Sequence, residues 1–196
     1  MLTTEFISKK PEVYDFETKI YVWDTFLPEY KSEHIEEQIF LNSNWRYINQ
    51  ATTDFCSHTI WGKSYMDSQV PYCIKHLIDE IQSKTGITFT KVEYCGLNGQ
   101  TKGMDACPHW DCEPEIAHKN ISILYYIGSF NSNGDLLLYN EDIYDGKRRA
   151  TDVYNQIEFV GNRLIIFDGS KLHSAKGPDN DTFRMSLILR GQYAIN

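Results

Sequence analysis

The chain has 196 residues, which fits one domain with a substantial hydrophobic core better than two domains. Hydrophobic residues make up 41% of the chain and charged residues 23%, as in globular proteins and unlike disordered ones. The net charge is −8 and no basic run is present, which argues against a large surface that tracks nucleic-acid phosphates. We therefore expect no nucleic-acid partner.

Targeting and membrane signals are missing from the printed sequence. The opening stretch MLTTEFISKKPEVYDFETK lacks the apolar core of a signal peptide. No window approaches the roughly 18 apolar residues of a membrane helix. The five cysteines are scattered and odd in number, so we expect reduced thiols. These features predict a cytoplasmic protein (of the host cell, if phage-encoded) with no membrane partner, and no pattern indicates an oligomeric state.

A strand and a helix are expected near the start of the chain. The stretch KIYVWDTF (19–26) alternates and carries β-forming residues, which predicts a strand. Pro28 then occupies a plausible first helical position. The helix that follows would place three apolar residues on one face, namely Ile35, Ile39 and Phe40.

A long loop and a second helix are expected next. Residues Arg46–Gln69 show no clear period, so we predict an aromatic-bearing loop, and such loops in compact domains often serve function. A helix is predicted over Pro71–Gly86, because apolar residues recur three or four positions apart and Gly86 is a good stop. Its apolar face would contain Ile74, Leu77, Ile78 and Ile81.

From Ile87 onward, short β-like runs are separated by Gly, Asn and Asp. Two helices followed by many strands predict an α+β fold with a double-stranded β-helix (jelly-roll) core of about eight strands and two N-terminal helices packed on one sheet. There is no repeat, low-complexity tract or linker. We therefore expect a single domain over residues 1–196, with helical support in 1–86 and the jelly-roll core in 87–196.

The stretch CPHWDCEPE (107–115) holds a histidine and an aspartate two positions apart. On a regular strand, His109 and Asp111 would point to the same face. His173, within IIFDGSKLHSAKGP, stands near a predicted strand end far downstream and would complete a set of two histidines and one carboxylate. Such a set leaves three coordination positions open and is typical of non-haem Fe(II) oxygenases.

Other interpretations of this stretch remain open at this point. A zinc site that includes Cys107 and Cys112 would need a second ligand pair at a suitable distance, and the sequence offers none. An acid–base pair of Asp111 and Glu113 has no third group to organise it. The residues could also be ordinary polar side chains of a strand. We expect the remaining histidines to be surface or satisfied residues: His34, His58, His76 and His118.

Arg184 opens the last apolar run, RMSLILR, downstream of His173. A guanidinium forks onto a carboxylate, as the distal carboxylate of 2-oxoglutarate would require. Ser186 lies two positions on and would share the same face of the strand. An edge or surface arginine is the alternative interpretation.

Three stretches, in this order, resemble the 2-oxoglutarate/Fe(II)-dependent dioxygenases. They are NGQTKGMDACPHWD, NISILYYIGSFNSNGDLLLYN and VGNRLIIFDGSKLHSAKGPDNDTFRMSLILR. They are most similar to prolyl 4-hydroxylase-like members of the type found in bacteriophage and marine bacterial sequences. The resemblance covers roughly residues 87–190 and extends more loosely to IYVWDTFLPE.

The resemblance implies that His109, Asp111 and His173 are catalytic residues that hold Fe(II). It implies 2-oxoglutarate and O2 as co-substrates, with ascorbate in support. The residues implied in binding 2-oxoglutarate are Arg184, Ser186, Tyr126, Asn98 and Tyr94.

The implied reaction is hydroxylation of a C–H bond, and relatives that halogenate instead lack the carboxylate of Asp111. The first substrate to expect is a prolyl residue in a peptide or protein, and the alternative is a free amino acid or another small metabolite. A cupin-like module that holds a metal or ligand without turnover, or a structural protein without metal, are the other functions to consider. Arg184 separates the oxygenase from the cupin-like module, because a barrel that only holds a metal does not need it.

The substrate mouth is expected in two segments, the loop Arg46–Gln69 and residues Glu113–Asn120. Aromatic residues of the loop would line the mouth or, equally, anchor the loop to the body: Phe55, Trp61 and Tyr65. Lys102 stands where an aromatic residue is common in the resembling proteins, and such departures leave the substrate undetermined.

Overall fold

The computed structural model describes residues 13–15, 20–53, 56–66, 69–113, 115–116, 120–129, 131–144 and 147–195. Within these ranges there are two helices, α1 (Glu29–Asn42) and α2 (Tyr72–Thr85). The strands are β1 (Val13–Asp15), β2 (Ile20–Trp23), β3 (Arg46–Thr53), β4 (Cys56–Ser64), β5 (Ile87–Gln100), β6 (Asn120–Ile127), β7 (Asn131–Tyr144), β8 (Lys147–Val160), β9 (Leu164–Asp168), β10 (His173–Ala175) and β11 (Arg184–Ile195).

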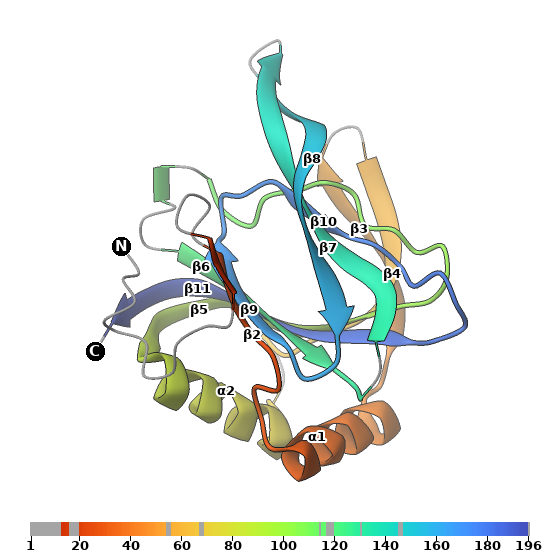
Figure 1. Cartoon of the computed structure of the whole chain (residues 1–196), viewed down its shortest axis with the longest axis vertical. Coiled ribbons are helices and arrows are strands. Elements are labelled where there is room, and N and C mark those ends of the chain that lie inside the picture. Colours follow the sequence, from red (N-terminus) through yellow and green to blue (C-terminus); the bar gives the residue numbers. More distant parts are fainter. Residues whose placement is uncertain are drawn as a thin grey trace.

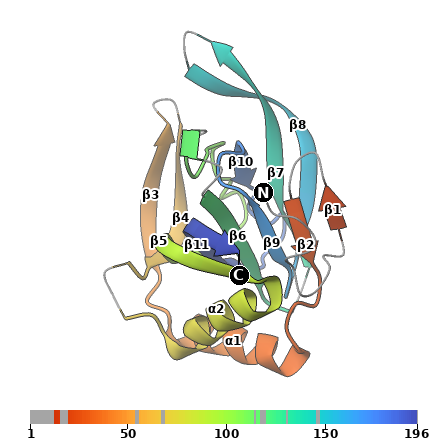
Figure 2. The same cartoon turned by 90° about the vertical axis from the view of Figure 1, so that its left-hand side faces the viewer.

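The described strands form two antiparallel sheets. The larger sheet has the order β1-β2-β9-β6-β11-β5-β4-β3, and the smaller has the order β10-β7-β8. Helices α1 and α2 lie along one side of the larger sheet, and the smaller sheet lies on its other side (Figures 1 and 2). The fold is thus two helices packed with mostly antiparallel sheets, as the sequence predicted at this level of detail.

A hydrophobic core fills each side of the larger sheet. In β6, Ile121, Ile123 and Tyr125 belong to the core that also contains the helices' apolar residues. The alternate residues Leu124 and Tyr126 belong to the core between the two sheets. Because both faces of β6 are buried, its sequence NISILYYI is a nearly continuous apolar run.

Helices α1 and α2 occupy the stretches that were predicted to be helical. Helix α2 ends at Gly86, whose φ of 73° is left-handed and therefore suits glycine. The predicted apolar face of α1 is too wide by one residue. Ile35 and Ile39 are buried, whereas Phe40 is 56% exposed because it lies about 100° around the helix from Ile39.

The prediction of a loop over Arg46–Gln69 is wrong. Strands β3 and β4 pair with each other, and β4 pairs with β5, so this segment extends the larger sheet. Strand β3 is an edge strand, and Tyr47 on it is 58% exposed. An edge strand with little apolar surface to bury shows no clean alternation, which hid β3 in the sequence. Phe55 lies outside the described residues.

The cysteines depart from expectation at one position. Cys73, Cys95 and Cys112 are free thiols. Cys107 is disulfide-bonded, so the prediction of five reduced thiols is wrong there. Whether two thiols meet depends on their approach in the fold, which spacing along the chain does not reveal.

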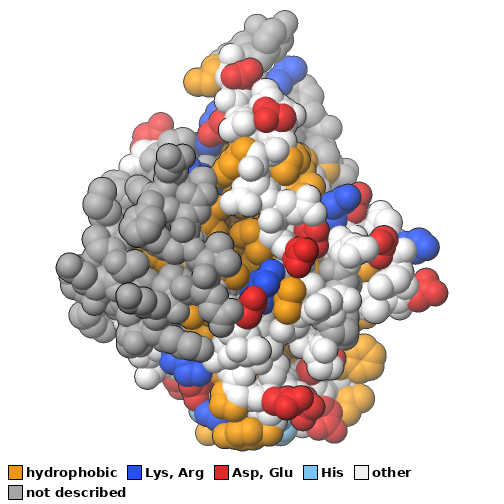
Figure 3. Space-filling view, viewed as in Figure 1, with side chains coloured by type: hydrophobic (Ala, Val, Ile, Leu, Met, Phe, Trp, Pro, Cys, Tyr) orange, Lys and Arg blue, Asp and Glu red, His pale blue; other side chains and the backbone are white. Residues whose placement is uncertain are grey.

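The surface carries charges of both signs. Acidic and basic side chains are interspersed on the face seen in Figure 3. The hairpin of β7 and β8 extends beyond the rest of the molecule (Figures 1 and 2). Neither helix in the described part of the chain is long and apolar enough to cross a membrane.

Candidate metal centre

Three side chains with metal-binding atoms meet in the space between the sheets. One ligand atom from each of His109, Asp111 and His173 lies within 4.8 Å of the other two. His109 Nε2 is 3.8 Å from Asp111 Oδ1, and His173 Nε2 is 3.7 Å from Asp111 Oδ2. Elsewhere in the described ranges, no other three such residues come together in this way.

His109 and Asp111 do not lie on the regular strand that the sequence predicted, whereas His173 begins β10. His109 and His173 form an isolated antiparallel bridge, in which the amide of each donates to the carbonyl of the other at 2.9 Å. The Asp111 amide donates to the Gly169 carbonyl at 2.7 Å. These bonds hold the segment against the turn between β9 and β10, so the three side chains converge although two of them precede β6 and one follows β9.

Both histidine rings are held in the tautomer that a metal requires. His109 Nδ1 lies 2.9 Å from the Cys107 carbonyl, and His173 Nδ1 lies 2.8 Å from the Lys171 carbonyl. Because a carbonyl oxygen only accepts, each Nδ1 carries a proton, which leaves Nε2, the ring nitrogen that faces Asp111, as the atom available to a metal. Burial, with His173 close by, lowers the pKa of His109 to about 4, so that ring is neutral at pH 7.

The carboxylate of Asp111 is fixed at both oxygens. Ser122 Oγ donates to Oδ2 at 2.6 Å, and Arg190 Nη1 donates to Oδ1 at 2.5 Å. Burial favours the neutral acid, but His173 and Arg190 outweigh it and hold the pKa of Asp111 below its usual range. The carboxylate is therefore ionised. Ser122 and Arg190 were missed in the sequence, although Arg190 keeps the alternation that begins at Arg184.

A cavity extends from the three side chains toward Arg184. The polar wall of this cavity comes from the neighbouring strands β5 and β11. Three pairs of residues, each pair directly opposite across the two strands, point from the same face of the sheet. The opposed pairs are Tyr94 and Arg190, Asn98 and Ser186, and Gln100 and Arg184. Sequence reasoning identified four of these six residues and missed Gln100 and Arg190. The apolar wall was not predicted and consists of Ile60, Ala106, Leu124, Leu136, Ala175 and Ile188.

Arg184 is a buried cation at the end of this cavity, with 1% of its surface exposed. Its Nε donates to the Gly134 carbonyl at 2.6 Å, and its Nη1 donates to Gln100 Oε1 at 2.7 Å. Its Cζ lies 5.0 Å from the ring centres of both Tyr126 and Phe159. Burial lowers the pKa of Arg184, and Tyr126 and the carboxylate of Asp135 offset this only in part. No carboxylate of the described residues lies close enough to Arg184 to form a salt bridge.

Two polar atoms near this cation lack partners. Asn98 Oδ1 and Tyr126 Oη are buried and accept or donate no hydrogen bond within the part of the chain that the structure describes. Burial also raises the pKa of Tyr126, which keeps its phenol protonated. A buried polar atom without a partner costs about 1–3 kcal/mol, so these atoms indicate a place for a polar ligand.

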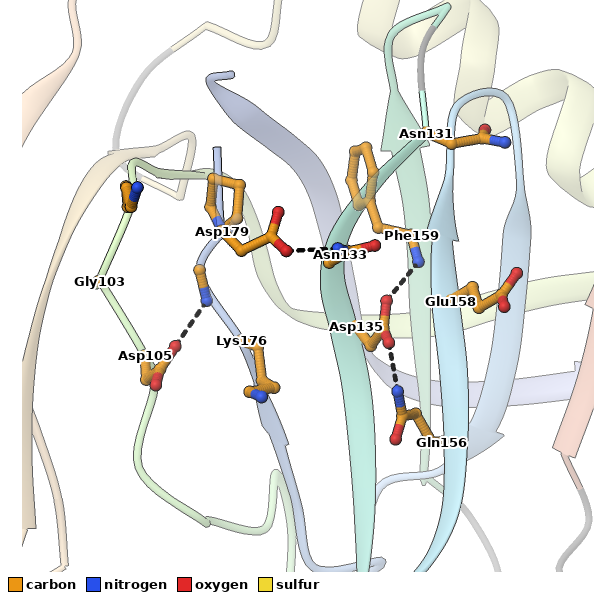
Figure 4. Close-up of a pocket in the computed structure, with 13 residues that line it drawn as sticks. Gly103, Asp105, Asn131, Asn133, Asp135, Gln156, Glu158, Phe159, Lys176 and Asp179 are labelled. Carbon is orange, nitrogen blue, oxygen red and sulfur yellow. Dashed lines mark hydrogen bonds between the residues drawn. The ribbon is translucent and has the colours of Figure 1, made fainter. Parts of the chain in front are cut away.

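A second cavity, of about 750 Å³, is lined by residues of β7, β8 and the segments 102–105 and 176–179 (Figure 4). Asp135 on its wall accepts hydrogen bonds from the Phe159 amide at 3.1 Å and from Gln156 Nε2. Phe159 thus belongs both to this wall and to the aromatic stack on Arg184. The second cavity does not contain the His109, Asp111 and His173 set, so the candidate metal centre belongs to the first.

Comparison with known proteins gives an answer at the level of the fold. No family model and no curated protein matches the chain. A prolyl hydroxylase from Trichoplax adhaerens, solved with a hypoxia inducible factor oxygen degradation domain peptide fragment, is 17% identical, with a TM-score of 0.62 over 89% of this chain and 82% of that one. A Pseudomonas putida prolyl-4-hydroxylase is 14% identical, with a TM-score of 0.59 over 89% of this chain and 92% of that one.

A third solved structure is that of an enzyme with a different printed activity, an epimerase. The epimerase SnoN, in complex with Fe3+, alpha ketoglutarate and nogalamycin RO, is 8% identical, with a TM-score of 0.62 over 91% of this chain and 82% of that one. The chain has the fold of the 2-oxoglutarate/Fe(II) oxygenases. At such low identity the likeness shows the fold, and the chemistry has to be argued from the residues of this chain.

The structure also locates Lys102 and two of the aromatic residues that were predicted to line a substrate mouth. Lys102 is exposed and lines the second cavity, away from the metal centre. Tyr65 is 5% exposed in the core beside the helices, so it anchors the chain and does not line a mouth. On β4, Ile60 lines the first cavity, whereas Trp61 packs against Tyr47 with ring centres 5.2 Å apart.

Trp110 lies between His109 and Asp111 in the sequence, but it does not line the first cavity. The Arg148 Cζ lies 4.7 Å from the centre of its ring, and Arg148 also pairs with Glu141 through two hydrogen bonds of 2.6 and 2.7 Å. The indole thus joins the β7–β8 hairpin to the ligand segment. The other predicted mouth segment, Glu113–Asn120, is only partly within the described residues.

Proposed function

We propose that the protein is a non-haem Fe(II), 2-oxoglutarate-dependent oxygenase that hydroxylates a C–H bond. The observation that carries the proposal is the placement of a buried arginine, without an ion-pair partner among the described residues, in the same cavity as two histidines and one ionised carboxylate. A site that only held a metal would have no use for that arginine, whose burial without an anion is unfavourable.

The residues present fit both the metal and the co-substrate. Two Nε2 lone pairs and one carboxylate match the donor set of non-haem Fe(II) oxygenases. The cation of Arg184 and the unpartnered atoms of Asn98 and Tyr126 suit a ligand that bears a carboxylate and further polar atoms. His109, Asp111 and His173 would therefore hold iron, and Arg184 would hold the distal carboxylate of 2-oxoglutarate.

The roles of the remaining residues follow from where they lie. Ser186 Oγ is 3.5 Å from Arg184 Nη1 and would assist it at the carboxylate. Tyr126 would donate a hydrogen bond from its hydroxyl to the same carboxylate. Asn98 and Tyr94 would line the path to the metal. The apolar wall excludes water from the reacting atoms. Bound iron supplies the activation of O2, such that 2-oxoglutarate, O2 and a C–H bond become succinate, CO2 and a C–OH group.

The finer architecture follows from the same proposal. The smaller sheet would pack against the central strands of the larger one as the two halves of a double-stranded β-helix, and the helices would support the larger sheet. Residues 1–196 would form one oxygenase domain, because the two hydrophobic cores share strands of the larger sheet such as β6 and β9.

The substrate class proposed first is a prolyl residue in a peptide or protein. Two of the solved structures that share this fold are prolyl hydroxylases, and one of them was solved with a peptide. A free amino acid or another small metabolite is the alternative, since SnoN in the same fold was solved with a small molecule. A cupin-like module without turnover is disfavoured by the buried Arg184.

The test is turnover of 2-oxoglutarate. Protein purified without oxygen is given Fe(II), 2-oxoglutarate, ascorbate and air, and succinate is measured. We expect succinate from the native protein, none from His109→Ala, and native yields from His34→Ala, which changes a histidine exposed on α1. Failure of the native protein both to form succinate and to bind 2-oxoglutarate in the presence of Mn(II) would overturn the proposal.

A further inference from the structure

Strand β11 places a second arginine in the cavity. Arg184, Ser186, Ile188 and Arg190 alternate along the strand and all line the same cavity, so the two guanidiniums enter it from one face. Their environments differ. Arg184 is 1% exposed, whereas the side chain of Arg190 is 30% exposed. Arg190 is therefore the cation that an incoming molecule meets, next to the metal centre.

The contacts of Arg190 leave most of its donors unused. Its Nη1 donates to Asp111 Oδ1 at 2.5 Å, and its Cζ lies 4.5 Å above the ring of Tyr94. Within the described ranges this is its one hydrogen bond, although a guanidinium has five N–H donors in a fixed plane. The stack on Tyr94 and the bond to Asp111 fix that plane, so the other donors keep a defined direction.

The charges in the cavity do not balance when the proposed metal and co-substrate are bound. The lining residues carry two guanidiniums, of Arg184 and Arg190, against the single carboxylate of Asp111. The two positive charges of Fe(II) and the two negative charges of 2-oxoglutarate cancel, so one positive charge remains. Arg184 would pair with the distal carboxylate and also lies in the field of Asp135, a carboxylate of the second cavity. The positive charge that no lining carboxylate balances therefore lies at the Arg190 end.

Among the described residues, no other acidic side chain lines the cavity to neutralise this charge. The wall around the metal end is apolar and includes Ile60, Leu124 and Ile188. In such surroundings an uncompensated charge is felt far more strongly than in water. A singly charged anion on the incoming molecule would restore neutrality, and a guanidinium with a fixed plane recognises a carboxylate best.

We propose that Arg190 determines specificity by binding a carboxylate of the substrate, close to the C–H bond that is oxidised. This inference rests on the proposed oxygenase function and narrows its substrate class. The carboxylate belongs either to a free amino acid or to a peptide, through its C-terminus or an acidic side chain. Both sources offer the same group to Arg190, so they are separated by experiment.

The experiment measures binding beside the metal and needs no turnover. The full chain is loaded with 2-oxoglutarate and with Mn(II) at a saturating concentration, and broadening of ligand proton signals by the paramagnetic ion is recorded. The probes are matched pairs: free amino acids and their primary amides, and N-acetylated peptides containing proline that end in a carboxylate or an amide, with and without an aspartate beside the proline.

We expect at least one carboxylate probe to be broadened and its amide not to be. Arg190→Gln should weaken binding of that probe at least tenfold, and Arg190→Lys should weaken it less, because the lysine keeps the charge but not the fork. Arg46→Gln, which removes an exposed arginine on β3, should leave binding unchanged. Broadening confined to the amino acids, or confined to the peptides, identifies the source of the carboxylate.

Equal broadening by acids and amides, or none by any acid, overturns the inference. So does an Arg190→Gln variant that binds the carboxylate probe as the native protein does, or one that loses 2-oxoglutarate instead, which would assign Arg190 to the co-substrate. Failure of the proposed function is seen separately, because binding of Mn(II) and 2-oxoglutarate to the native protein is measured before any probe is added.

Discussion

Ser122 on β6 donates a hydrogen bond of 2.6 Å to Oδ2 of Asp111. Arg190 on β11 donates to the other oxygen of the same carboxylate. Because β6 and β11 are adjacent strands of the larger sheet, the sheet itself sets the orientation of a side chain that lies outside it. Partners of this kind fix metal ligands and are as much a part of a metal site as the ligands themselves.

Ser122→Ala should weaken metal binding by about 10- to 100-fold, as loss of such partners does elsewhere. The carboxylate would lose the donor that fixes Oδ2, while the three ligand atoms stay in place. The measurement is a titration with Mn(II) followed by electron paramagnetic resonance. Ser174→Ala is the matched control, because that buried serine on β10 bonds to Tyr139 and not to Asp111. Equal affinities in the native protein and Ser122→Ala would contradict the role given to Ser122.

The two helices are linked by charge as well as by apolar packing. Lys31 Nζ on α1 lies 2.5 Å from Glu80 Oε1 on α2, and Lys84 Nζ lies 3.4 Å from Glu80 Oε2. The bond to Lys31 lowers the pKa of Glu80 below its ordinary value of 4.5. A carboxyl whose pKa is lowered in the folded state stabilises that state above its unfolded pKa and loses this effect as the pH falls.

Glu80→Gln should therefore lower the thermal midpoint slightly at pH 7, and the difference from the native protein should vanish as the pH falls below 4.5. The effect is small because the pair is near the surface, and added salt should reduce it. Thermal unfolding at both pH values measures it. Glu37→Gln, at an exposed position of α1, serves as the control and should show no such pH-dependent difference.

The sequence was sufficient for the metal-binding candidates because ligand chemistry restricts residue type. A histidine and an aspartate two apart, with a histidine far downstream, gave the set that the structure brings together as His109, Asp111 and His173. The route was partly mistaken, since an isolated bridge and not a regular strand carries His109. The three side chains still meet, because their position depends on the bridge between His109 and His173 and not on how each segment is classified. Their role as metal ligands stays a prediction.

Residues that act through a partner were missed for a different reason. Gln100 became part of the site because it stands opposite Arg184, and the register of β5 against β11 cannot be read from either strand alone. Ile60 was missed because β3 and β4 were interpreted as a loop. In both cases the residue reaches the cavity only because its strand pairs with another strand. The sequence pattern of one segment does not show which strand that is.

Gly134 makes room for the proposed co-substrate cation. A Cβ at this position would lie 2.5 Å from Arg184 Cδ and 3.1 Å from the Lys176 carbonyl. Gly134→Ala should therefore displace Arg184 and raise the Kd for 2-oxoglutarate at least about tenfold, a loss of about 1.4 kcal/mol. The affinity for Mn(II) should stay the same, since the atoms nearest to that Cβ belong to Arg184 and Lys176 and not to the metal-binding candidates.

Calorimetric titration with 2-oxoglutarate in the presence of Mn(II) measures the effect of Gly134→Ala. Asn133→Ala changes the preceding, exposed residue and should leave the Kd unaltered. A Gly134→Ala variant with native affinity for 2-oxoglutarate would show that Arg184 tolerates displacement. Equal losses for the metal and the co-substrate would instead indicate general damage to the fold.

Tyr126 and Tyr125 are neighbours on β6 whose hydroxyls have opposite surroundings. Tyr125 Oη donates to Asn162 Oδ1 at 3.0 Å and lies 3.2 Å from Ser32 Oγ on α1, so its hydroxyl helps to join the helix to the sheet. Tyr126 Oη is buried between the sheets without a partner among the described residues. One hydroxyl is thus committed to the fold, and the other is available to a ligand.

Tyr126→Phe should raise the Kd for 2-oxoglutarate by about five- to tenfold, the effect of one hydrogen bond of about 1–1.5 kcal/mol. It should change the thermal midpoint of the ligand-free protein little, because apart from its interaction with the Arg184 guanidinium the buried hydroxyl has no hydrogen bond there to lose. Tyr125→Phe should do the reverse, lowering the midpoint and leaving the Kd unchanged. If Tyr126→Phe destabilised the ligand-free protein and bound 2-oxoglutarate normally, its hydroxyl would belong to the fold, and the carboxylate would depend on Arg184 and Ser186 alone.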